Sequence, residues 1–198
     1  MTDDTIFESI EGFFIEDEWE FHRMEESPVL SMGFSGKNGK WNCYAQAREA
    51  QRQFVFYSVM PINAPEDKRN DVAEFVTRSN YGMIIGNFEL DYRDGEVRYK
   101  TSIDVEGTIL EPALIRQLVY ANVIITDRYL PGLMSVIYGG KDPMTAVEQI
   151  EAPPQDIEAL DEGEEMPDLS GLDLSFLDDD DDDDDFDDDD KFAGDKLN

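Results

Sequence analysis

Hydrophobic residues recur at spacings of three and four near the start of the chain, with acidic residues between them. This spacing places them on one side of a helix, so the pattern predicts an amphipathic helix over residues 3–18. Asp3 or Asp4 is expected to cap its start, because a carboxylate accepts hydrogen bonds from the first free amides. The buried side of this helix is predicted to hold Ile6, Ile10, Phe13 and Phe14.

The next part of the chain alternates as strands do, and extended segments are predicted at residues 19–24, 29–35, 41–48 and 53–60. Residues 36–40 contain Asn and Gly, which tolerate positive φ, and are predicted to be a hairpin loop. The last segment is apolar on both faces, which indicates a central strand that ends at Pro61. Along residues 41–48, one face carries Trp41, Cys43, Ala45 and Ala47, and the other carries Asn42, Tyr44, Gln46 and Arg48.

A second helix is predicted to begin in residues 64–67, where a proline and two acidic residues suit the first turn. Gly82 is expected to form its C-terminal cap. Residues 84–92 and 96–105 then alternate on either side of a tight turn at 93–95, which predicts a hairpin. The inner face of the helix is predicted to hold Val72, Phe75, Val76 and Ser79.

The longest helix is predicted to run from Pro112 to Tyr129, to kink at Pro131 and to continue to Ile137. A short helix is predicted at residues 143–150. Helices grouped between runs of hairpin-linked strands are typical of an α+β fold. The sequence therefore predicts one antiparallel sheet packed with helices.

Charge is distributed unevenly along the chain. Of the 47 acidic residues, 22 lie in residues 151–198, together with only two of the 16 basic residues. A segment of this composition buries too little apolar surface to offset the entropy lost on ordering. We therefore expect one α+β domain at residues 1–150, followed by a disordered, acidic, low-complexity tail at residues 151–198.

The net charge of −31 argues against nucleic acids and anionic membranes as partners, since both attract basic surfaces. It suits basic proteins, basic peptides or cations. The single Cys43 fits a reducing compartment. The acidic start of the sequence is unlike a signal peptide, and no segment has the uncharged length of a membrane span. These patterns predict a cytoplasmic protein.

No motif in the sequence predicts catalysis, a metal site or a cofactor. His22 lies near several carboxylates but has no second histidine, so we interpret it as a surface or hydrogen-bonded residue rather than a metal ligand or general base. Cys43 lies on an apolar strand face and is interpreted as a core residue. A metal- or ligand-responsive sensor or enzyme that uses His22 and the nearby carboxylates remains an alternative hypothesis.

The predicted long helix is apolar on nearly all sides, so it must be covered on more than one of them. Burial against the sheet and first helix of the same chain is one interpretation. A homodimer interface is the other. The interface residues would be Ile115, Val119, Val123 and Ile124.

Two regions contain groups that suit a protein partner. The polar sheet face is solvated in the simplest interpretation, but its aromatic and cationic groups can receive a peptide. The tail combines acids with isolated apolar residues, as do disordered segments that dock into partners, although it can also act through solubility alone. The candidate partner-binding residues are Tyr44, Arg48, Arg98, Lys100, Phe176 and Phe186.

Two stretches carry a recognisable pattern of helix cap, hairpin turn and proline-containing helix: FVTRSNYGMIIGNFELDYRDGEVRYKTSIDVEG and ALIRQLVYANVIITDRYLPGLMSVI. Together with the upstream elements, residues 1–140 resemble the YbjN-domain family of bacterial proteins. The resemblance implies a fold like that of type III secretion chaperones, whose relatives commonly dimerise and bind segments of other proteins. It also implies a sensory-transduction regulator, supplies no catalytic motif, and does not extend to the tail.

The resulting hypothesis is a non-enzymatic, chaperone-like or regulatory module that binds segments of partner proteins. Its acidic tail would suit a basic partner. We expect a homodimer, no cofactor and no nucleic acid. A role in solubility or structure alone is the second alternative.

Overall fold

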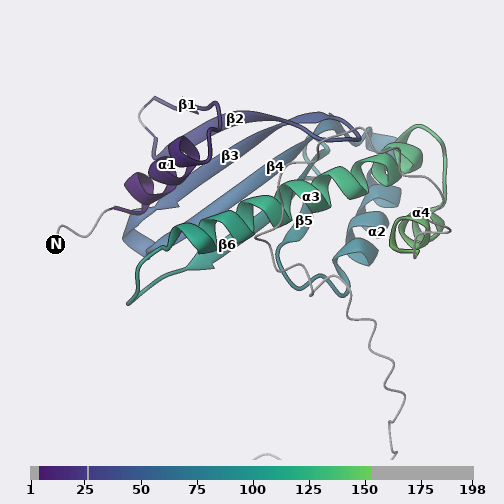
Figure 1. Ribbon diagram of the computed structural model, residues 1–198. Helices are drawn as coiled ribbons and strands as arrows, with labels where there is room; N and C mark the ends of the chain where they lie inside the picture. Colours follow the sequence, from purple (N-terminus) through teal and green to yellow (C-terminus); the bar gives the residue numbers. More distant parts are fainter. Residues whose placement is uncertain (1–4, 26, 153–198) are drawn as a thin grey trace, which may run out of the picture. The chain divides into compact units, whose positions relative to one another are not determined.

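The computed structural model describes residues 5–25 and 27–152, and Figure 1 shows how their elements are arranged. All of them belong to the first of two units into which the chain divides, Met1–Glu162 and Gly163–Asn198. The predicted tail lies almost wholly outside the described residues. The helices are α1 (Ile6–Glu16), α2 (Arg69–Asn80), α3 (Pro112–Ile137) and α4 (Pro143–Glu151), and the strands are β1 (His22–Arg23), β2 (Val29–Ser35), β3 (Lys40–Arg48), β4 (Gln53–Asn63), β5 (Asn87–Leu90) and β6 (Glu96–Asp104).

Within the described residues, the six strands form one antiparallel sheet in the order β1-β2-β3-β4-β6-β5. The predicted α+β fold with an antiparallel sheet is therefore confirmed. Residues 53–60 lie in β4, which has β3 on one side and β6 on the other, as their two-sided apolarity predicted. The alternation predicted for β3 is also observed, with Trp41, Cys43, Ala45 and Ala47 buried.

Helices α1 and α3 both lie across one face of the sheet, and α2 and α4 lie beside the C-terminal half of α3 (Figure 1). The core forms between this face and the helices, and Phe14, Phe54, Phe56 and Tyr99 are among its largest fully buried side chains. None of the four described helices covers the other face. The sheet is therefore packed on one side only, as antiparallel sheets commonly are.

The first helix begins one turn later than predicted, and its cap is Thr5 rather than Asp3 or Asp4. The Thr5 hydroxyl accepts from the amide of Glu8, and the Glu8 carboxylate accepts from the amide of Thr5 at 2.8 Å. This reciprocal pair is a capping box, in which each side chain accepts a hydrogen bond from the backbone amide of the other residue.

Pro61 does not end β4, which continues to Asn63. Between Val59 and Asn63 the pairing with β6 shifts in register, because the partners of these two residues are Arg98 and Glu96. A β-bulge leaves backbone positions unpaired, so a proline without an N–H is tolerated there. The predicted end of the strand was wrong for this reason.

Other boundaries also differ from the prediction. The proline-containing turn leads into a 3-10 turn, Glu66–Lys68, and α2 itself begins only at Arg69. Its end agrees with the prediction, since Gly82 follows the cap residue and has a φ of 92°. The strands β1 and β5 are shorter than the extended segments predicted for them.

Helix α3 continues without interruption through Pro131. A proline has no N–H to offer the carbonyl of the residue four positions earlier, which is Asp127. The side chain of Asn38, in the predicted hairpin loop between β2 and β3, donates to that carbonyl at 3.0 Å. The Asp127 carboxylate in turn accepts from the backbone amides of Lys37 and Asn38, at 3.1 and 2.8 Å. The hairpin and the helix thus satisfy each other's free groups.

Candidate protein-binding face

Side chains from four strands, β3, β4, β5 and β6, share the sheet face that the described helices leave uncovered. Strand register places Tyr44 opposite Tyr57, and Tyr57 opposite Lys100, so these three form one row across β3, β4 and β6. Directly opposed residues have Cβ atoms about 5 Å apart, which brings their side chains into contact. The neighbouring row consists of Asn42, Val59, Arg98 and Glu89. We call these two rows the open face.

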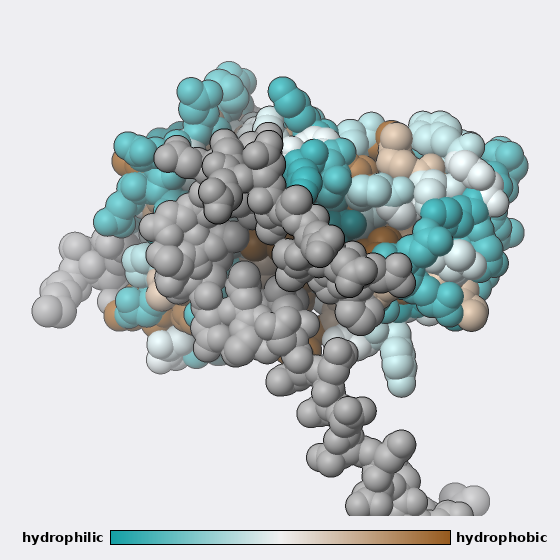
Figure 2. Space-filling model, turned by 45° about the vertical axis from the view of Figure 1, so that its right-hand side comes forward, coloured by the Kyte–Doolittle hydropathy of each residue, from teal (hydrophilic) through white to brown (hydrophobic). Residues whose placement is uncertain are grey.

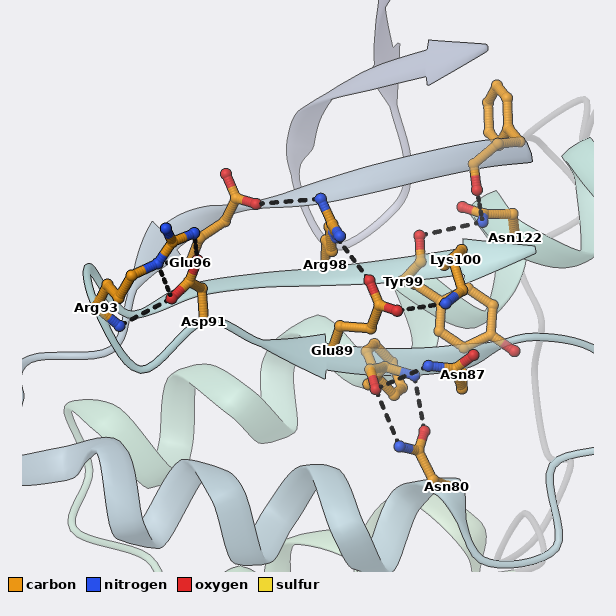
Figure 3. A network of polar contacts seen from close by, with 12 residues as sticks. Asn80, Asn87, Glu89, Asp91, Arg93, Glu96, Arg98, Tyr99, Lys100 and Asn122 are labelled. Atoms are coloured by element: carbon orange, nitrogen blue, oxygen red, sulfur yellow. Dashed lines mark hydrogen bonds and ion pairs between the residues drawn. The ribbon is translucent and has the colours of Figure 1, made fainter. Parts of the chain in front are cut away.

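Glu89 is the centre of the charges on the open face (Figure 3). Its carboxylate accepts from Nε of Arg98 at 2.7 Å and also forms an ion pair with Lys100. A weaker pair joins Arg98 to Glu96 at 3.8 Å. Burial opposes the ionisation of Glu89, but the hydrogen bonds from Lys100 and Arg98 outweigh it, so the pKa of Glu89 is lowered. The carboxylate therefore holds both cations in fixed positions.

Arg98 also lies over an aromatic ring. Its guanidinium carbon is 4.5 Å from the centroid of the Tyr57 ring, a distance at which the cation is attracted to the ring face. A planar guanidinium on a tyrosine presents a flat surface that is apolar on its face and donates hydrogen bonds at its rim. Such a surface can stack on an aromatic side chain or bind a carboxylate or carbonyl of a partner.

Two hollows extend the open face. One, of about 680 Å³, lies at the β5–β6 turn, and its lining includes Glu89, Glu96 and Arg98. Beside it Arg93 pairs with Asp91, and hydrogen bonds from Arg93 lower the pKa of Asp91 to about 2. The other hollow, of about 500 Å³, lies near the β2–β3 hairpin and is lined by Gly33, Phe34, Ser35, Lys40, Trp41, Asn42, Val59, Met60 and Pro61.

The edge of the sheet beyond β5 is closed by a side chain. The amide of Asn80, at the end of α2, accepts from the backbone N–H of Phe88 at 2.7 Å and donates to its carbonyl at 3.0 Å (Figure 3). A strand added at this edge would need the same two groups. The contact of Asn80 with the edge of β5 could not be predicted from hydrophobic periodicity, because Asn80 belongs to neither the apolar nor the charged pattern of α2.

Three of the four partner-binding residues predicted in the domain fall on the open face. Tyr44, Arg98 and Lys100 lie in its two rows. Arg48 has the same orientation but lies at the end of β3, opposite Gln53. Glu89 and Tyr57, which orient the cations, were not predicted. The β5–β6 hairpin was expected, but the pairing of β6 with β4, which brings Tyr57 beside these charges, is not visible in the sequence. Phe176 and Phe186 lie outside the described residues.

The predicted dimer residues are placed differently from expectation. Ile115, Val119 and Val123 are at most 1% exposed and belong to the core of the same chain. They cannot contact a second copy of the folded domain, so this part of the prediction was wrong. Ile124 is half-buried and remains accessible. The first interpretation, burial against the sheet of the same chain, accounts for their apolarity.

His22 and Cys43 occupy unlike environments. His22 is exposed in β1, and among residues 5–25 and 27–152 no group of three or more His, Cys, Asp or Glu side chains could hold a metal ion. Cys43 is fully buried beside Ser58, and burial raises the pKa of its thiol to about 12. No helix in the described part is long and apolar enough to cross a membrane.

Comparisons with known proteins are consistent with this fold. The family model YbjN, described as "putative bacterial sensory transduction regulator", matches residues 7–134. Among solved structures, YbjN from E. coli, described as "a putative transcription regulator", matches with a TM-score of 0.50 and 8% identity over 65% of this chain and 94% of that chain. This likeness concerns the fold alone.

A chain of the HopA1–SchA chaperone–effector complex has a TM-score of 0.45 and 10% identity, covering 62% of this chain and 91% of that chain. A TM-score this low supports no conclusion about fold or partner. No curated protein matches the sequence.

Proposed function

The chain belongs to the YbjN family of bacterial proteins, and from that membership we propose that it is a non-enzymatic, regulatory or chaperone-like module that binds a segment of a partner protein on its open face. The main observation that supports the proposal is that no described helix covers the open face of the sheet. Tyr44, Tyr57, Arg98 and Lys100 are gathered there, opposite the helices.

The composition of the open face suits a peptide better than a small reactive substrate. Tyrosine and arginine are enriched where proteins meet, because each combines apolar area with directed hydrogen bonds. The cations are already paired with Glu89, at 2.7 Å for Arg98. A partner can therefore exchange one set of polar contacts for another without burying an unpaired charge.

The acidic tail adds a second contribution in this proposal. With 22 acidic residues in residues 151–198, it would draw basic partners toward the domain over distances of about a Debye length, roughly 8 Å at physiological salt. The open face would then provide the specific contacts. A cytoplasmic location and a homodimer belong to the same proposal.

Site-specific photo-crosslinking tests the open face. A photoreactive phenylalanine derivative is placed at Tyr44, and in a separate variant at Tyr138, an exposed tyrosine outside the open face. We expect crosslinks to a partner in cells from position 44 and none from position 138. Replacing Arg98 and Lys100 by glutamine should remove the crosslink, whereas the matched pair Arg128→Gln and Lys141→Gln should leave it unchanged.

Equal crosslinking from both tyrosine positions would contradict the proposal. So would a crosslink at position 44 that survives the loss of both cations. Circular dichroism of each variant separates a loss of binding from a loss of folding.

A further inference from the structure

A groove between α2 and α4 lies away from the open face. Its volume is about 880 Å³, and its walls come from these two helices and from Tyr81, which directly follows α2. On the surface drawn in Figure 2, hydrophobic residues appear in small patches among hydrophilic ones. The groove is lined by Ala73, Glu74, Thr77, Arg78, Tyr81, Met144, Val147, Glu148 and Glu151.

Two large apolar side chains in this groove face solvent. Tyr81 is 90% exposed and Met144 is 45% exposed, and the buried Val147 lines the groove beside them. Apolar area of this kind gains about 25 cal/mol for each Å² that a partner removes from water. A flexible methionine next to a tyrosine also adapts to different apolar partners.

Charge in the groove is predominantly negative. Glu74 and Arg78 neutralise each other in an i, i+4 pair at 2.8 Å. The remaining charged lining residues, Glu148 and Glu151, both come from α4 and are both acidic. A bound segment therefore contacts the apolar side chains of Tyr81 and Met144 and has two carboxylates along one side.

The helices that line the groove restrict the conformation that a bound segment can adopt. The backbone N–H and C=O groups within helices are already bonded inside each helix, so they offer no edge to which a strand could add. A bound segment must satisfy its own backbone groups, which a helix does. Helix α2 has 12 residues and is therefore about 18 Å long, which matches about three turns of a bound helix.

We propose that the α2–α4 groove binds an amphipathic helix of a partner protein, with an apolar stripe against Tyr81 and Met144 and with lysines or arginines facing Glu148 and Glu151. The partner is basic because an acidic helix would be repelled, and the chain's own residues 153–198 contain 21 acidic and two basic residues. This site does not depend on the open face and goes beyond the function proposed for it.

The test uses the full chain and a fluorescent synthetic peptide of about 14 residues, with leucines at i, i+3, i+4 and i+7 and lysines beside them. Anisotropy should show saturable binding. The same peptide with glutamates in place of the lysines should bind at least about tenfold more weakly, since it loses the attraction to Glu148 and Glu151.

Variants locate the binding site. The double variant Tyr81→Ser and Met144→Ser should weaken binding of the lysine peptide at least about tenfold, because it removes the two exposed apolar side chains of the groove. The matched control, Tyr138→Ser and Met24→Ser, alters a tyrosine and a methionine that are 66% and 45% exposed outside the groove, and it should bind as the original does. All four side chains are exposed, so both variants should fold, which circular dichroism checks.

Several results would overturn the proposal. Absence of saturable binding is one, and equal binding of the lysine and glutamate peptides is another. Equal affinity of the groove variant and its control would place the peptide elsewhere, for example on the acidic tail. Loss of binding in both variants would likewise remove the groove from consideration.

Discussion

The side-chain amide of Asn80 accepts from the backbone N–H of Phe88 at 2.7 Å and donates to its carbonyl at 3.0 Å, on the outer edge of β5. An asparagine amide offers one donor and one acceptor side by side, as the backbone of a neighbouring strand does. Asn80 therefore takes the place of a seventh strand at this edge. Because exposed edges invite pairing with other chains, the closed edge directs partners to other surfaces of the domain.

Replacing Asn80 by alanine should lower the free energy of unfolding by about 2 kcal/mol, since the N–H of the buried Phe88 loses its acceptor and its carbonyl keeps only the 3.2 Å hydrogen bond from the Asn87 side chain. Urea unfolding measures the change. Asn70 is a suitable control, because its exposed side chain makes only a 3.3 Å contact with Tyr92, and Asn70→Ala should change stability by less than about 0.5 kcal/mol. Similar losses in the two variants would show that the edge contact contributes nothing.

The sequence allows the elements to be predicted well where one periodicity dominates. The alternation along residues 41–48 and the apolar spacing of Ile6, Ile10, Phe13 and Phe14 each describe a buried face, and each is observed. Two boundaries set by polar contacts were missed for different reasons. Thr5 with Glu8 three residues later is a local capping-box pattern that the prediction overlooked, whereas the bulge that admits Pro61 depends on the pairing of β4 with β6 and is not a property of a local pattern.

The candidate site could be predicted only in part for a related reason. Strand β3 alone indicates that Tyr44 faces away from the core. The row that brings Tyr57 to Arg98 and Glu89 requires the pairing of β6 with β4, and helix α2 and strand β5 lie between these two strands in the sequence. Ile115, Val119 and Val123 were wrongly assigned to a dimer interface, because apolar residues on several sides of a helix do not reveal which chain covers them.

The ion pairs of Glu89 should make stability depend on pH in the acidic range. Its folded-state pKa is lowered from the ordinary value of 4.5, so its contribution is present above that value and is lost as pH falls through the lowered pKa. The side chains of both pairs are partly exposed to water, which screens the charges and limits the contribution to below about 1 kcal/mol. Glu89→Gln should be less stable than the original chain at pH 7 and equally stable at pH 2, measured by urea unfolding. A difference that persists unchanged at pH 2 would contradict this.

Cys43 should react slowly with thiol reagents in the folded protein. Burial raises the pKa of its thiol to about 12, so very little thiolate is present at pH 7, and the sulfur is fully covered. Labelling with a disulfide reagent should be slow in buffer and fast in denaturing urea. Rapid labelling of the native chain would show that this part of the sheet opens readily.

The homodimer remains a prediction, with Ile124 as the accessible member of the predicted interface. Light scattering at micromolar concentration should give twice the mass of the chain. Ile124→Lys should shift the mass toward that of a monomer, because a buried lysine opposes association. Ile109→Lys, at a position that is 60% exposed, should have no effect. A monomer mass that persists on concentration would rule out the dimer.

Removal of residues 153–198 should separate the contributions of domain and tail. Because α4 ends at Glu151, the deletion leaves every described helix and strand intact, and the thermal unfolding midpoint should change little. The 21 acids removed would attract a basic partner through screened charges. The intact chain should therefore bind lysine-rich peptides with an affinity that falls steeply as salt rises, and the shortened chain with a much flatter response. Identical salt dependence in the two chains would mean that the tail takes no part in binding and serves solubility instead.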